Sequence, residues 1–147
     1  MTRKSQKQIP ILFSDEFHCQ VDWLQFDKII SDRGSKYSVT GGRVKSRENL
    51  KKFLKKLKSK SKFAKATHNS WAARVSHEGA VYETKSDDGE TGAGQVILHQ
   101  LRKQKVIDVI VVVTRWYGGV KLHADRFKHL QDATIFWVEK CREGDGD

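Results

Sequence analysis

The segment that most constrains the fold is the run from Val109 to Thr114, which is almost entirely β-branched and apolar. A short continuous apolar run of this kind predicts a strand that is buried on both faces. Arg115, Trp116 and Tyr117 follow at once, and a pair of glycines then permits a tight turn or a close approach of another backbone. Two interpretations stay open, namely a binding site at a sheet edge or a packed turn in which both aromatic residues belong to the core.

A helix is predicted over 46–58, because four apolar residues from Leu50 to Leu57 recur at i, i+3, i+4 and i+7 and Ser46 before them is a good N-cap. Short strand patterns over 69–75 and 81–84 predict a β-hairpin. The other predicted elements are a strand over 37–44 with paired glycines at 41–42 that suggest a bulge or close approach, a polar loop over 59–62, a hairpin turn over 77–79, a turn over 86–90, a helix from 91 or 92 to 103, and a last helix over about 125–141.

This order of elements predicts an α+β fold, a two-layer sandwich in which helices pack on one face of a mixed sheet. At 147 residues the chain is one domain with room for its own core. Apolar residues over Phe17–Ile30 follow a mixed period, so this part is poorly specified and is expected to hold one strand. The predicted organisation is an N-terminal lead-in over 1–29, a domain over 30–141 and an acidic tail over 142–147.

Positive charge is concentrated in one segment, from Arg43 to Lys65. This segment holds eleven basic residues and one acid, so its net charge of +10 equals that of the whole protein. Such a patch attracts phosphate backbones or acidic protein surfaces. A solvated lysine face that only keeps the protein soluble is the alternative. The candidate nucleic-acid residues on the predicted helix are Arg47, Lys51, Lys52, Lys55, Lys56 and Lys58.

Composition argues against membrane and secreted classes. No apolar run approaches the roughly 20 residues that span a bilayer, and the N-terminus lacks the apolar core of a secretory signal. Cys19 and Cys141 fit no metal or redox spacing, so a reduced, cytoplasmic protein is expected.

Three carboxylates, Asp87, Asp88 and Glu90, stand in four residues. They could hold a hard cation such as magnesium or supply a general base. The favoured interpretation is structural, with one carboxylate capping the helix that follows. Gly92 and Gly94 could cradle an anion, but close packing of helix on sheet is preferred, because the phosphate-loop pattern is incomplete.

His68 lies between Thr67 and Asn69 and is a candidate acid–base residue. An enzyme that uses His68 with the carboxylate cluster is therefore the alternative function. No serine or cysteine occupies a recognisable nucleophile turn, so a hydrolytic triad is not supported.

Three segments in order resemble the IMPACT family, whose bacterial branch is called the YigZ family. They read KATHNSWAARV at 65–75, DDGETGAG at 87–94 and VVVTRWYGGVKLHADRFKHL at 111–130, and ISDRGSKY at 30–37 is a weaker match. The resemblance covers about 30–141, and the RWYGG and DRFKH forms resemble the eukaryotic branch.

The resemblance implies a fold like the second domain of a small-subunit ribosomal protein and a non-enzymatic regulator with no cofactor or metal. Eukaryotic members restrain the kinase that phosphorylates a translation initiation factor during starvation. They compete for its ribosome-associated activator, and some associate with actin. Ribosome or RNA contact, a translation-associated protein partner and a role in the stress response are expected accordingly.

The chain departs from the family pattern in three ways. About 30 residues precede the matching region, so no N-terminal RWD domain is expected, and no C-terminal ferredoxin-like domain is expected either. His123-Ala124 replaces a Gly-Pro or Gly-Ala pair, so a tight turn is expected to be altered there. The candidate binding surface comprises His68, Asn69, Asp87, Asp88, Glu90, Arg115, Trp116, Tyr117, Gly118, Gly119, Lys121, Asp125 and Arg126.

Overall fold

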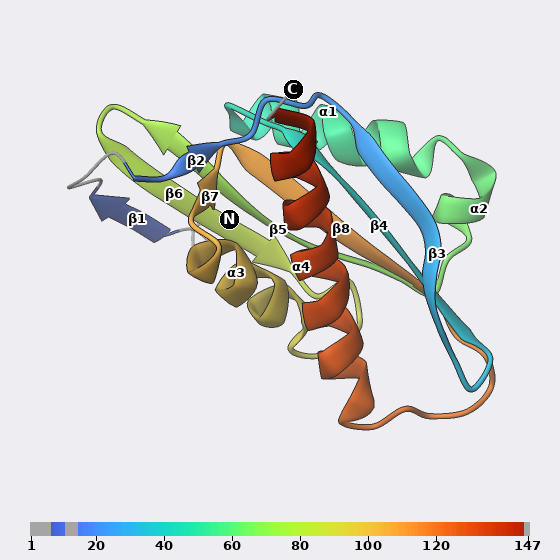
Figure 1. The fold of residues 1–147 in the computed structure, drawn as a ribbon. Coiled ribbons are helices and arrows are strands. Elements are labelled where there is room, and N and C mark those ends of the chain that lie inside the picture. Colours follow the sequence, from blue (N-terminus) through green and yellow to red (C-terminus); the bar gives the residue numbers. More distant parts are fainter. Residues whose placement is uncertain (1–6, 11–14, 146–147) are drawn as a thin grey trace.

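The computed structural model of the protein describes residues 7–10 and 15–145, and their fold is α+β. Among these residues, six strands form one sheet in which every neighbouring pair is antiparallel (Figure 1). Two short strands, β2 (Phe17–His18) and β7 (Val106–Ile107), form a separate parallel pair. The order across the main sheet is β1 (Lys7–Pro10), β6 (Ala80–Ser86), β5 (His68–His77), β8 (Val109–Trp116), β4 (Ser35–Arg43) and β3 (Leu24–Asp32).

Helices cover both faces of this sheet. In Figure 1, α3 (Ala93–Lys103) and α4 (Asp125–Asp145) cross the near face, whereas α1 (Arg47–Lys58) and α2 (Ser61–Ala64) lie on the far side. The central strand β8 divides its side chains between two cores. Val109, Val111 and Val113 pack in the α3–α4 core, and Ile110 and Val112 pack in the α1–α2 core.

The predicted α+β class is confirmed, but the predicted arrangement is wrong in two respects. The helices lie on both faces, so the fold has three layers, and the main sheet is antiparallel rather than mixed. The apolar run of β8 explains the helices on both faces, because a strand that is hydrophobic on both faces needs cover on both sides.

Most predicted elements are confirmed. Ser46 caps α1 as expected, since its side chain accepts a hydrogen bond from the backbone N–H of Asn49 at 3.0 Å. The β5–β6 turn has positive φ angles at Glu78 (47°) and Gly79 (77°), as a two-residue hairpin turn requires. The predicted loop over 59–62 is wrong, because Ser61 begins the short helix α2. The predicted lead-in holds β1, β2 and most of β3, while residues 1–6 and 11–14 lie outside the described part, as do 146–147 of the predicted tail.

The paired glycines of β4 let elements approach the sheet closely from both sides. A Cβ on Gly41 would lie 2.5 Å from the Trp137 ring of α4, and one on Gly42 would lie 2.2 Å from the backbone oxygen of Asp22. Register with β8 is unbroken through both positions. Close approach, rather than a bulge, is therefore the explanation for this pair.

In the described part of the chain, no helix combines the length and apolarity that a membrane crossing needs. Cys19 and Cys141 are buried and unbridged, with their sulfur atoms 4.0 Å apart.

Candidate functional site

The three segments that resemble the family, 65–75, 87–94 and 111–130, meet at one end of the sheet. We call the site formed there the loop cluster, namely His68, Asn69, Asp87, Asp88, Glu90 and residues 115–119. β5 begins there, whereas β6 and β8 end there, because the three strands are antiparallel neighbours. His68 pairs in register with Arg115, and the backbone oxygen of Asp88 lies 2.9 Å from His68 Nδ1. Asn69 donates its backbone N–H to Asp88 Oδ2 at 2.7 Å. The topology thus joins segments that lie as far apart as residues 68 and 115.

The aspartates of the turn accept hydrogen bonds from backbone N–H groups. Asp87 accepts from the backbone N–H groups of Gly92 at 3.0 Å and Gly94 at 2.8 Å, at the beginning of α3. The capping interpretation is therefore confirmed for Asp87. A Cβ on Gly94 would lie 3.1–3.2 Å from atoms of Asp87, Lys85 and Ser86, so the expected close packing of this glycine is confirmed too.

Glu90 and Arg115 form a buried ion pair at the centre of the loop cluster. Glu90 Oε2 accepts from Arg115 Nη1 at 2.7 Å, and the two residues are 3% and 5% exposed. Arg115 Nη2 also lies 3.4 Å from Ser35 Oγ. Burial, and next the charge of Glu90, raises the pKa of Tyr37 to about 12, so this phenol stays neutral at ordinary pH.

The turn after β8 is not a packed turn with both aromatic residues in the core, and only part of it is exposed enough to serve as a binding site at the sheet edge. Trp116 packs partly buried against the α1–α2 core, and its Nε1–H donates to the backbone oxygen of Lys62 at 3.0 Å. Tyr117 is 47% exposed, so it is not core. A Cβ on Gly118 would lie 2.0 Å from the Gly34 carbonyl carbon, which explains the glycine there.

The remaining predicted residues lie at the margin of the loop cluster. Lys121 is exposed, Asp125 begins α4 and accepts a hydrogen bond from Arg33, and Arg126 donates to the backbone oxygen of Thr91 at 3.0 Å. His123 adopts φ 52°, the left-handed region that favours glycine. The backbone at His123 therefore has the left-handed conformation that the glycine of the family pattern would adopt more readily.

Ser35 was not among the predicted site residues, yet it holds the turn after β8 by accepting a hydrogen bond from the backbone N–H of Gly118 at 3.1 Å. Asp32 was not among them either, and its pKa is lowered by hydrogen bonds from Arg33 and then His129. The signal was present, because both residues stand in the ISDRGSKY segment.

The geometry of the loop cluster favours a structural role for its acids. Across the described residues, no group of three or more histidine, cysteine or acidic side chains is arranged to hold a metal ion. Glu90 is buried against an arginine, and Asp87 and Asp88 bind backbone N–H groups. What the cluster offers a partner is its exposed rim, at Tyr117 and Lys121.

The candidate nucleic-acid residues lie on one helix, α1, as predicted. Leu50, Phe53 and Leu57 bury one side of α1. The ammonium group of Lys56 lies 4.5 Å from the ring centre of Trp23, so the basic face includes an aromatic surface. The six predicted cations of α1 are all exposed, namely Arg47, Lys51, Lys52, Lys55, Lys56 and Lys58.

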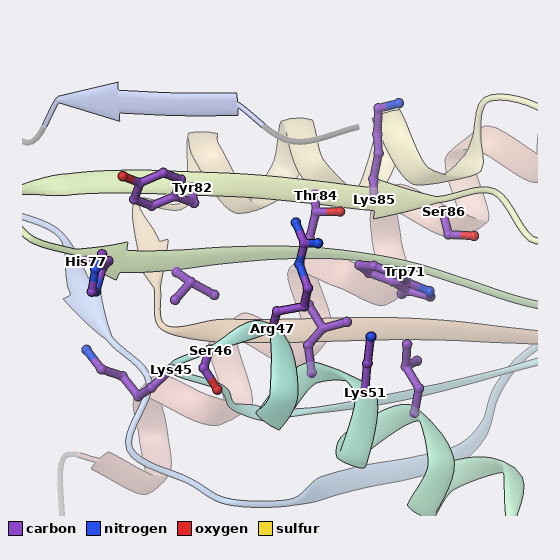
Figure 2. A pocket seen from close by; sticks show the side chains of 13 residues that line it. Lys45, Ser46, Arg47, Lys51, Trp71, His77, Tyr82, Thr84, Lys85 and Ser86 are labelled. Carbon is purple, nitrogen blue, oxygen red and sulfur yellow. The ribbon is translucent and has the colours of Figure 1, made fainter. Parts of the chain in front are cut away.

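A groove of about 730 Å³ runs between α1 and the β5–β6 hairpin (Figure 2). Its apolar wall includes Trp71 and Val75 of β5 and Leu54 of α1, and a shallower hollow of about 460 Å³ lies on the other side of α1 beside Trp23. Trp71 and Val75 share one face of β5, as predicted, but their partial cover by α1 depends on tertiary packing and could not be predicted from the strand pattern.

A known protein family matches most of the chain. The Impact N-terminal domain family matches residues 33–136. A protein IMPACT homolog of Saccharomyces cerevisiae is 43% identical over 110 residues, which are 74% of this chain and 42% of that protein. Protein IMPACT of Rattus norvegicus is 42% identical over 114 residues, 76% of this chain and 36% of that protein.

Solved structures resemble the fold as well. The two-domain translational regulator Yih1 superimposes with a TM-score of 0.57 at 37% identity, over 90% of this chain and 52% of that one. A hypothetical protein gives a TM-score of 0.68 at 20% identity, over 92% of this chain and 61% of that one, which shows a shared fold alone.

This chain spans only about two fifths of the length of the yeast relative and about a third of the rat one. The family match nevertheless covers most of the chain, including the loop cluster and α1. The chain belongs to the IMPACT family, through its Impact N-terminal domain.

Proposed function

We propose that this chain is a non-enzymatic binding module of translational control, which contacts the ribosome, RNA or a translation-associated protein through the basic face of α1. The observation that carries the proposal is the placement of charge. The segment from Arg43 to Lys65 holds the whole net charge of +10, and its six predicted cations on α1 are exposed. A concentrated positive surface attracts polyanions over a Debye length of roughly 10 Å at moderate salt.

The similarity to a protein described as a translational regulator supports the biological setting. The finer parts of the proposal are a cytoplasmic location and contacts with actin or with the activator of the starvation kinase. We also propose that the fold is related to the second domain of a small-subunit ribosomal protein.

Binding is favoured over catalysis by the state of the acids in the loop cluster. An acid–base pair needs a carboxylate that can reach a substrate. Glu90 is 3% exposed and paired with Arg115, and both oxygens of Asp87 accept from the backbone of the α3 start. His68 meets a backbone oxygen of Asp88 rather than its carboxylate.

The test is sedimentation of the purified protein with ribosomes over a salt series. A variant carries Lys51, Lys52, Lys55 and Lys56 changed to Glu. A matched control carries the same charge change on the α3–α4 side, at Lys103, Lys105, Lys128 and Lys140. We expect association that weakens steeply with salt, is lost in the α1 variant and persists in the control.

Two results would count against the proposal. One is absence of co-sedimentation at low salt, which would overturn contact with the ribosome and leave a translation-associated protein as the partner to test. The other is equal loss in both variants, since that would mean a diffuse charge effect instead of a binding face.

A further inference from the structure

The groove between α1 and the β5–β6 hairpin combines an apolar floor with open access. Leu54, Trp71 and Val75 line it, and each remains partly exposed although each packs against the α1–α2 core. Tyr82 stands opposite Val75 in the sheet register and extends the same surface. A groove lined by several half-covered apolar side chains with a few polar groups around them is typical of a binding site.

The groove stays open because α1 is narrower than the sheet behind it. Phe53 and Leu57 of α1 share a core with Ile110 and Val112 of β8, and the Phe53 ring lies against Gly42 of β4. β5 and β6, on the β1 side of β8, extend beyond that cover. Their side chains on this face therefore form the floor and far wall of the groove (Figure 2).

Positive charge borders this apolar floor. Lys51 points from α1 toward Trp71 in Figure 2, and Arg47 extends from the beginning of α1 toward β6. Lys45 lies at one end, where it also contacts Asp108 at 3.3 Å, and Lys85 lies at the outer edge. Among the thirteen described residues that line the groove, none is acidic.

We propose that this groove binds an acidic amphipathic segment of a partner protein. The apolar residues of that segment would pack on Leu54, Trp71 and Val75, and its carboxylates would face Lys51 and Arg47. A helix with apolar residues at i, i+3, i+4 and i+7 fits such a groove, and about 730 Å³ lies within the range of binding pockets. The proposal rests on the binding role proposed above and names the partner class for one surface.

The positive border of the groove would attract either kind of polyanion, and it is the chemistry of the floor that favours a protein over a nucleic acid. Single-stranded nucleic acids bind through phosphate contacts and stacking of successive bases on aromatic rings. Here aliphatic Leu54 and Val75 separate the aromatic positions, and apolar contact with them stabilises aliphatic side chains by roughly 25 cal/mol per Å² removed from water. Burying a charged sugar–phosphate backbone there would be unfavourable.

The direct test uses a fluorescein-labelled 16-residue peptide with leucines at helical spacing and glutamates on either side of them. Fluorescence anisotropy measures its affinity for the full chain. A control peptide has the same composition with its leucines moved off one face, and an oligouridine of equal charge serves as the nucleic-acid probe. We expect the amphipathic peptide to bind at least about tenfold more tightly than the shuffled one.

Two neighbouring lysines provide a matched pair of variants. Lys51 lines this groove, whereas Lys52 lines the hollow on the other side of α1. We expect Lys51→Glu to weaken peptide binding by about tenfold and Lys52→Glu by less than about threefold. Val75→Thr keeps the shape of the floor but adds a hydroxyl group, and we expect it to weaken binding by roughly fivefold.

A measurement on the unaltered protein removes any dependence on how the variants fold. In a ¹⁵N NMR titration, the indole signal of Trp71 should shift on addition of the peptide, and that of buried Trp137 should stay in place. The proposal is overturned if the shuffled peptide binds as well, if both lysine changes weaken binding equally, or if oligouridine displaces the peptide and shifts Trp71. Salt-sensitive ribosome association alongside any of these results would leave the proposed function standing without this partner class.

Discussion

Glu90 and Arg115 are almost completely removed from water, and a 2.7 Å hydrogen bond joins them. In this pair, Glu90 Oε1 and Arg115 Nε have no hydrogen-bond partner among the described residues. A buried charge is tolerated only when it is paired, because its lost hydration must be compensated. The pair therefore fixes the turn before α3 to the end of β8, and it positions the exposed rim at Tyr117.

Removing one charge of this pair tests that structural role. We expect Glu90→Ala to lower the free energy of unfolding by about 3–5 kcal/mol, because Arg115 would keep a buried charge without a counter-ion. The control is Asp132→Ala, which breaks the exposed pair of Asp132 with Lys128 and should change stability by about 0–1 kcal/mol. Urea unfolding measures both, and similar losses in the two variants would contradict the role.

At the level of residues, sequence patterns identified the members of the loop cluster but not their partners. Asp87 preceded a predicted helix, so its capping role could be inferred from position alone. The Glu90–Arg115 pair could not be predicted, since it depends on which strands are neighbours and on their register. Ser35 was missed for the same reason, because it meets Gly118 only when β4 lies beside β8.

The two glycines after β8 differ in what they contribute to the connection between elements. Gly118 lies against the backbone of Gly34 in the β3–β4 turn, where a Cβ would approach to 2.0 Å. Gly119 has open space around it but a φ of 91°. One glycine is therefore required by packing between two turns, and the other by backbone conformation.

Alanine at each position separates these two requirements. We expect Gly119→Ala to lower the free energy of unfolding by about 1–2 kcal/mol, the ordinary penalty of a left-handed residue. Gly118→Ala should exceed that loss, because the backbone of Gly34 must move away. Thermal and urea unfolding of both variants give the comparison, and a smaller loss for Gly118→Ala would mean that the turns separate easily.

At the level of elements, periodicity predicted those with a strong one-sided pattern. The stripe from Leu50 to Leu57 placed α1 correctly. β3 was poorly specified because it is an edge strand, mostly half-buried, with a register shift between Phe26 and Ile30. The two-sided cover of the sheet was already implied by β8, whose apolar residues leave no face for water, although the order of elements favoured a two-layer arrangement.

Across the whole molecule, charge and stability oppose each other on α1. Lys51 and Lys55 are four residues apart, as are Lys52 and Lys56, so like charges repel along the helix. Each such pair is unfavourable by about 0.2–0.5 kcal/mol. A polyanionic partner that neutralises this face would therefore stabilise the folded protein as well as bind it.

This opposition predicts a dependence of stability on salt. We expect the combined changes Lys51→Gln and Lys55→Gln to raise the free energy of unfolding at low salt by roughly 0.5 kcal/mol, and the gain to fade near roughly 0.5 M salt, where repulsion is screened. Arginine at the same two positions keeps the charge and should leave the salt dependence unchanged. Urea unfolding across a salt series measures this, and a gain that persists at high salt would point to helix propensity instead. A gain confined to low salt would mean that the basic face lowers the stability of the isolated chain, as expected of a surface whose charges are neutralised on binding.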